Sequence, residues 1–220
     1  MRTTTCRALA RIAAVVLGAT SCLSGPAIAP KTFSIDPPAP RSAVSTGTVI
    51  LAVPRVEVTQ PYSGQSLIYS TGEHTLQRDP YARFVAPPGA LLTAAIRGYL
   101  VNADFVRDVV APGDGELWAA TVDVAVSKME GELRPGGSSA VLIMRIRVRS
   151  GPAMTREPGE ILLKTYTSTI PITRTTAQDF VNAWNQGLEN IMTQFQSDLR
   201  SSLVAAGSLQ ELPGAPPGRN

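Results

Sequence analysis

The sequence predicts an α+β domain in which a mostly antiparallel sheet has two helices packed on one face. Three long segments in its second half alternate apolar and polar residues, as strands with one buried and one solvated face do. Two other segments repeat apolar residues every three or four positions, which is typical of amphipathic helices. The predicted elements follow one another as strands, helix, strands and helix, which favours helices covering a sheet over a helical bundle.

Short β-branched and apolar runs predict further strands around the first helix, because proline- and glycine-rich stretches interrupt them. These short strands are expected at residues 32–35, 48–53, 67–70, 83–85 and 106–110. The three long strands are expected at residues 116–129, 139–150 and 161–172.

The first helix is expected at residues 90–102. The second follows Thr176, which can cap it, and has Asp179 in its first turn. Its apolar stripe comprises Phe180, Trp184, Leu188, Ile191, Phe195 and Leu199. Two interpretations are open for Trp184 and Phe195. They pack in the core, as such stripes usually do, or they line a lipid-binding groove.

The N-terminus has the order of a lipoprotein signal peptide. Arg2, Arg7 and Arg11 precede an apolar run at 12–19, and small residues lead to Cys22. We therefore expect a signal peptide at 1–21 and lipidation of Cys22. The alternative is cleavage by ordinary signal peptidase after Ala27-Ile28-Ala29, which would release a soluble chain, although Pro30 opposes that cut.

Processing would remove most of the basic character of the chain. Three of its 20 basic residues leave with the leader, so 17 basic residues face 17 acidic ones and nucleic-acid binding is not expected. Cys6 leaves too, so no intrachain disulfide can form. The mature chain then divides into a lipidated cysteine and tether at 22–31, one domain at 32–206 and a flexible tail at 207–220.

The sequence offers little for catalysis. His74 is the sole histidine and lies in an expected turn between two short strands. Carboxylates occur singly, and no glycine-rich phosphate loop opens a helix. We therefore expect no enzyme activity, metal or cofactor.

An unusual row of arginines, Arg145, Arg147 and Arg149, shares the solvated face of one predicted strand. In one interpretation they pair across strands with acids such as Asp123 or Glu132. In the other they form a contact face for an acidic partner or lipid head groups.

Several motifs make the chain similar to the ABC-type transport auxiliary lipoprotein family, the group that contains the paraquat-inducible lipoprotein of MCE-type lipid transport systems. The likeness covers roughly residues 32–203. The motifs are Thr32-Phe33-Ser34-Ile35, Val49-Ile50-Leu51-Ala52-Val53, Gly64-Gln65-Ser66-Leu67-Ile68-Tyr69 and the segment 83–92, in which Phe84 stands where the family usually has tryptophan.

The resemblance implies a periplasm-facing lipoprotein that works with an MCE-domain protein, an ABC permease and an ATPase. Leu23 follows the cysteine instead of the aspartate that retains lipoproteins in the inner membrane, so the outer membrane of a Gram-negative envelope is expected. Homo-oligomer formation stays open. So do two other functions, an assembly or structural lipoprotein of another envelope machine and a soluble periplasmic binding protein.

Overall fold

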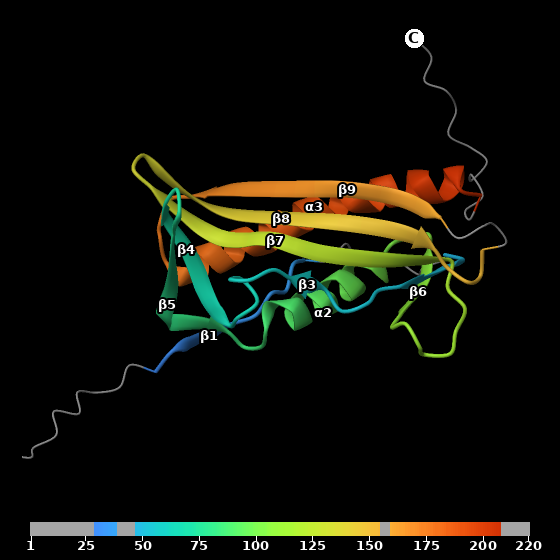
Figure 1. Ribbon diagram of the computed structural model, residues 1–220, viewed down its shortest axis with the longest axis horizontal. Helices are drawn as coiled ribbons and strands as arrows, with labels where there is room; N and C mark the ends of the chain where they lie inside the picture. The colour runs from blue at the N-terminus through green and yellow to red at the C-terminus, as the bar shows by residue number, and fades with distance from the viewer. Residues whose placement is uncertain (1–28, 39–46, 155–158, 208–220) are drawn as a thin grey trace, which may run out of the picture.

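The computed structural model describes residues 29–38, 47–154 and 159–207, which form one large sheet and two helices (Figure 1). The first six strands are β1 (Lys31–Phe33), β2 (Val49–Ala52), β3 (Glu57–Val58), β4 (Ser66–Gly72), β5 (Thr75–Phe84) and β6 (Val106–Val110). The long strands are β7 (Ala120–Arg134), β8 (Gly137–Ser150) and β9 (Glu160–Ile172). The helices are α2 (Pro88–Leu100) and α3 (Ala177–Ala205). Neither helix is long and apolar enough to cross a membrane.

Strand β7 organises the sheet. One of its edges pairs antiparallel with β8 from end to end, and β8 pairs antiparallel with β9. Its other edge pairs in succession with β2, β3 and β4, all parallel to it. Strand β6 adds parallel to β2, β5 adds antiparallel to β4, and β1 adds parallel to β5.

The α+β class is confirmed, but the expectation of a mostly antiparallel sheet is wrong because the sheet is mixed. The antiparallel part is the hairpin pair β7–β8–β9 together with β4–β5. The parallel pairs join strands that are distant in sequence, such as β2 with β7. Short runs of β-branched residues show that a strand exists but not which way its neighbour runs, so the sequence pattern did not reveal these pairs.

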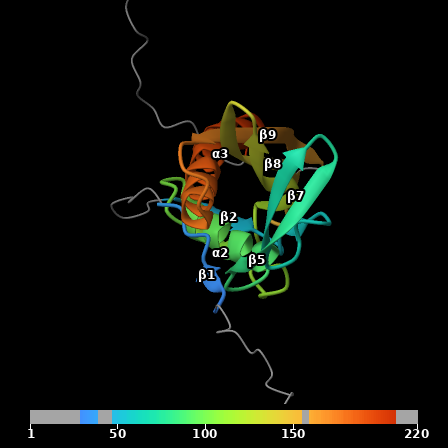
Figure 2. The same ribbon diagram turned by 90° about the vertical axis from the view of Figure 1, so that its left-hand side faces the viewer.

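Both helices contribute to one hydrophobic core on the same face of the sheet (Figure 2). Helix α2 has proline in its first turn, and the Thr176 side chain caps α3 by accepting a hydrogen bond from the Asp179 N–H at 3.2 Å. The sheet residues that face the helices include Val122, Val124 and Val126 from β7 and Met144, Ile146 and Val148 from β8.

The apolar stripe of α3 lies in the core. Trp184 is 2% exposed and packs against Phe84 and Phe180, while Phe195 is fully buried against Tyr166. The Phe180 ring lies so close to Gly131 of β7 that a Cβ there would come within 2.3 Å of it. The core interpretation of the stripe is therefore confirmed.

Polar contacts fix the second half of α3 to β9. Asp198 accepts hydrogen bonds from the Lys164 ammonium and from the Tyr166 hydroxyl, each at 2.7 Å. These two donors hold the pKa of Asp198 below its ordinary value of 3.8. The charged carboxylate is therefore the form that the folded state stabilises.

Several element boundaries differ from the sequence prediction. Helix α2 begins two residues earlier than expected, β5 begins at Thr75 instead of residue 83, and β3 was not predicted because it has only two residues. The predicted leader at 1–21, Cys22 and the predicted tail at 207–220, except Gly207, lie outside the described residues, so the proposed domain limits stay predictions.

We predict that Trp184→Ala destabilises the domain by about 3–5 kcal/mol, because it leaves a cavity among packed aromatic rings. Trp184→Phe should cost much less, since the Trp184 Nε1 has no hydrogen-bond partner among the described residues and an aromatic ring is retained. Urea unfolding of both variants checks this. An unchanged midpoint for Trp184→Ala would contradict the assigned core position.

We further predict that Asp198→Asn lowers the free energy of unfolding at pH 7 by about 1–2 kcal/mol. A carboxylate with a depressed pKa stabilises the fold above its unfolded-state pKa, and this contribution is lost as the pH falls through the folded-state value. The difference from wild type should therefore shrink below about pH 4. Asp36→Asn, which changes an exposed carboxylate without an ion pair among the described residues, is the control. A difference that does not vary with pH would refute this account.

Candidate functional site

The sheet face opposite the helices is covered at two places along β7. Near its start, the Trp118 Nε1 donates a hydrogen bond to the Thr121 hydroxyl at 2.9 Å. Further along, the turn after β3 brings the Tyr62 hydroxyl to Glu130 at 2.5 Å. The stretch of β7 between these two contacts, with the neighbouring part of β8, remains open to solvent on this outer face.

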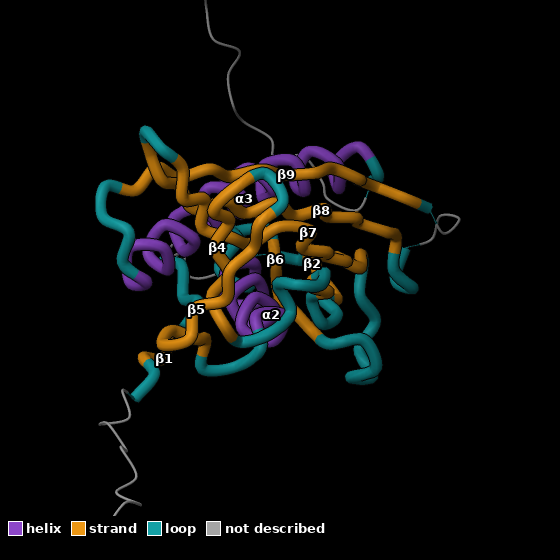
Figure 3. The backbone as a smooth tube through the Cα atoms, turned by 60° about the vertical axis from the view of Figure 1, so that its left-hand side comes forward, coloured by secondary structure: helices purple, strands orange, loops and turns teal. Residues whose placement is uncertain are grey.

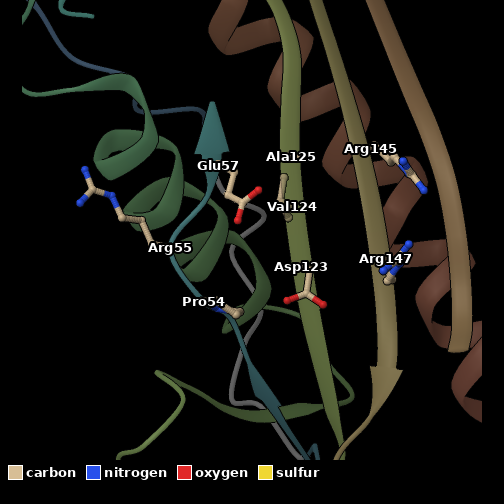
Figure 4. A pocket seen from close by; sticks show the side chains of 8 residues that line it. All are labelled: Pro54, Arg55, Glu57, Asp123, Val124, Ala125, Arg145 and Arg147. Carbon is tan, nitrogen blue, oxygen red and sulfur yellow. The ribbon is translucent and has the colours of Figure 1, made fainter. Parts of the chain in front are cut away.

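A shallow hollow of about 310 Å³ occupies this open stretch (Figure 4). Two carboxylates, Glu57 of β3 and Asp123 of β7, line the hollow together with Arg145 and Arg147 of β8. The Arg55 side chain points away from the carboxylates. The full lining consists of Pro54, Arg55, Glu57, Asp123, Val124, Ala125, Arg145 and Arg147.

The predicted arginine row is present. Arg145, Arg147 and Arg149 are exposed, while Ile146 and Val148 between them and Met144 before them are buried. Alternation along β8 produces this arrangement, because its inward residues pack against the helices.

Two of the three arginines form ion pairs. The Arg149 Nε lies 2.8 Å from the Asp123 Oδ2, and this hydrogen bond raises the pKa of the Arg149 guanidinium. The Arg147 Nε lies 3.2 Å from the Glu160 carboxylate. Arg145 forms no ion pair within the described ranges, which distinguishes it from its neighbours.

Of the two acids that the sequence indicated as partners, Asp123 pairs with the row and Glu132 does not. Glu132 lies opposite Ser139 in the β7–β8 register, well away from Arg145. It pairs instead with Lys128 at 3.0 Å and with Arg134 at 3.4 Å, and the hydrogen bond from Lys128 lowers the pKa of Glu132.

A buried cluster on the same face was missed by the sequence analysis. Glu130 is only 2% exposed, and its carboxylate contacts the Lys128 ammonium at 2.9 Å and the Tyr62 hydroxyl. Burial, together with the carboxylate, raises the pKa of Tyr62. The alternation of Lys128, Glu130 and Glu132 on one strand was the available signal, but nothing in the sequence placed Tyr62 over it.

These charges suit recognition by ion pairing. Asp123 and Glu160 pair with Arg149 and Arg147, and Glu57 lines the same hollow as Arg145, so cations and carboxylates nearly balance locally. A balanced surface produces a weak long-range field, and its arginines therefore act at short range on groups that fit between them.

The remaining predicted site residues are separate from this face. His74 lies in the exposed turn between β4 and β5, as the sequence indicated. Cys22 lies outside the described residues. Within the described part of the chain, no group of three or more His, Cys, Asp or Glu side chains is arranged to hold a metal ion.

Known structures share this fold. A crystal structure from Xanthomonas campestris matches with a TM-score of 0.66 at 11% identity, covering 81% of this chain and 100% of that one. An uncharacterized protein matches with a TM-score of 0.61 at 13% identity, over 78% of this chain and 99% of that one. A hypothetical protein from Chlamydia trachomatis gives 0.51 at 8% identity, over 70% and 99%.

At such identities these structures support the fold alone, and no curated protein matches the sequence. A family model is more informative. Residues 32–195 match the model of the ABC-type transport auxiliary lipoprotein component, close to the range over which the sequence motifs indicated this resemblance. Since the match spans well over half of the 220 residues, the chain belongs to the ABC-type transport auxiliary lipoprotein component family.

Proposed function

We propose that this protein is a non-enzymatic auxiliary lipoprotein of an ABC transport system of the MCE lipid-transport type. In this proposal it faces the periplasm from the outer membrane and holds or docks the MCE component, which works with a permease and an ATPase. The observation that carries the proposal is the family match over residues 32–195. The sequence motifs that resemble the family containing the paraquat-inducible lipoprotein support its finer part.

Anchoring is assigned to Cys22. A basic, apolar and small-residue order precedes it, and Leu23 follows it where aspartate would retain the protein in the inner membrane. Several acyl chains on one residue hold a protein firmly at a bilayer, whereas a single chain gives only marginal binding.

Docking is assigned to the arginine face, defined by Arg145, Arg147 and Arg149. Asp123 and Glu160 already neutralise two of these residues, so Arg145 is the cation most available to an acidic group on a partner. Glu57 lies across the hollow and forms no ion pair among the described residues. A fitting partner surface therefore presents a carboxylate to Arg145 and a cation to Glu57.

A holding role also agrees with the position of this face. The arginines lie opposite residues 121–125 of β7, whereas β4, which leads through β5 to β1, joins β7 at residues 131–132. Eight residues of strand separate Asp123 from Gly131, or about 25 Å. The face is thus set away from the strand at which the N-terminal tether enters the domain.

We predict that Cys22→Ala abolishes palmitate incorporation and releases the protein from membranes, because Cys22 would carry all the acyl chains. Metabolic labelling and membrane fractionation of the full-length chain check this. Cys6→Ala is the matched control and should keep both label and membrane association, since Cys6 would leave with the leader. A labelled, membrane-bound Cys22→Ala protein would disprove the anchor.

We also predict that Arg145→Glu weakens co-purification with the MCE component while leaving stability within about 0.5 kcal/mol of wild type. The residue is exposed and breaks no described ion pair when replaced, so its loss acts on the partner contact. Replacing all three arginines by glutamate should remove binding and its salt sensitivity together.

The matched control reverses three exposed arginines outside this face, Arg78, Arg107 and Arg174. It should co-purify as wild type does. Undiminished recovery of the triple variant would rule out the arginine face as the docking site, and equal loss in the control would show a dependence on overall charge only.

A further inference from the structure

We propose that the outer face of β5, formed by Tyr81, Arg83 and the adjoining Val85, rests on the lipid surface in which Cys22 is anchored. We call these three residues the β5 patch. The proposal rests on the lipid anchor proposed above and adds a second, non-covalent contact between the folded domain and the bilayer.

Alternation along the chain separates the β5 patch from the core. Ala82 and Phe84 are 4% and 3% exposed and contribute to the hydrophobic core. Between and beside them, Tyr81 is 55% exposed and Val85 is 59% exposed, and Arg83 is exposed as well. The patch thus presents an aromatic ring, a cation and an aliphatic side chain in a row on one side of the chain.

The tether enters the domain beside this patch. Strand β1 pairs with β5 so that Lys31 is opposite Ala82 and Thr32 is opposite Arg83, and the Val85 N–H donates to the Phe33 carbonyl at 2.8 Å. Figure 1 and Figure 3 both show β1 and β5 together at one end of the molecule. Only eight residues separate Cys22 from Lys31, so the two positions lie at most about 32 Å apart when the chain is fully extended.

This short connection keeps the β5 patch close to the bilayer surface. A domain held within this distance of a bilayer has a high effective concentration of lipid head groups around the root of its tether. Weak contacts that would not bind a free protein to a membrane are therefore sufficient to orient this one.

The charges at the tether root favour a lipid surface with anionic head groups. Lys31 and Arg83 are exposed and form no ion pair among the described residues. The neighbouring carboxylate, Asp79, accepts hydrogen bonds from the Tyr69 hydroxyl at 3.0 Å and from the N–H groups of Tyr81 and Ala82 at 2.8 and 2.9 Å. Asp79 is thus held by β4 and β5 themselves, which leaves the two cations for phosphate.

The side chains also suit this interface. A tyrosine ring is apolar with a polar end and partitions to the head-group level of bilayers. A guanidinium binds phosphate through two parallel hydrogen bonds. Val85 is a small apolar side chain, 59% exposed, that can contact the boundary between head groups and acyl chains.

The test uses full-length lipidated protein reconstituted into vesicles of phosphatidylethanolamine and phosphatidylglycerol. A lipidated Cys22 carries no free thiol, so Val85→Cys supplies a single site for an environment-sensitive fluorophore. Leu117→Cys is the matched control, since Leu117 is 66% exposed and precedes β7 at the end remote from β4. Quenching by head-group spin-labelled lipid is measured for both.

We expect strong quenching at position 85 and little at position 117. Adding Arg83→Glu should lower the ratio of lipid-contacting to free domain at least about fivefold, because the change removes one basic residue near an anionic surface and adds an acidic one. Arg107→Glu, which reverses an arginine of β6, should leave it unchanged.

Flotation of the vesicles separates the two proposals. Protein that floats with the lipid but shows equal quenching at both positions would overturn the β5 patch and leave the anchor intact. Protein that does not float would overturn both. A fluorescence change at position 85 that rises with protein-to-lipid ratio but resists the lipid quencher would mean that a second copy covers the patch, which overturns the lipid proposal.

Discussion

Pairing along both edges of β7 is the constraint on which the rest of the molecule depends. Its 15 residues bond to β8 on one side and to three separate short strands on the other. Strands of two to seven residues are too short to persist alone. Strand β7 is the common partner that joins β3, the β2–β6 pair and the β4–β5 hairpin into one sheet. Every outer feature, including the hollow beside Glu57, takes its position from this register.

Helix α3 then stabilises the strands that β7 aligns. Its 29 residues extend about 43 Å, close to the length of about 46 Å expected for the 14 residues of β8. One continuous apolar stripe can therefore cover the inner faces of β8 and β9 along their length. Phe180 packs closely against Gly131 and so fixes the start of α3 to the far end of β7. The hydrogen bonds from β9 to Asp198 fix the second half of α3.

Periodicity in the sequence was sufficient to predict an element and its buried face where the element is long and one of its faces is buried. It placed the stripe of α3, the alternation of β8 and the exposure of Arg145, Arg147 and Arg149. It could not give the parallel pairing of β2 with β7, because pairing direction leaves no trace in a four-residue run. Periodicity also could not choose between Asp123 and Glu132 as arginine partners, since that choice depends on strand register. It could not predict the contact between Tyr62 and Glu130, which lie 68 positions apart in the sequence.

The arginines of β8 and the arginine of β5 have different interactions because the carboxylates near them are bonded differently. On β8, Asp123 and Glu160 neutralise Arg149 and Arg147, which weakens attraction to any nearby anionic surface and leaves specificity to a partner that fits around Arg145. On β5, the Asp79 carboxylate is already bonded by backbone and tyrosine donors, and Arg83 forms no ion pair among the described residues. Internal acids placed in this way would keep the arginine face from competing for the bilayer, and a lipid-anchored protein that must present one face to a partner needs that discrimination.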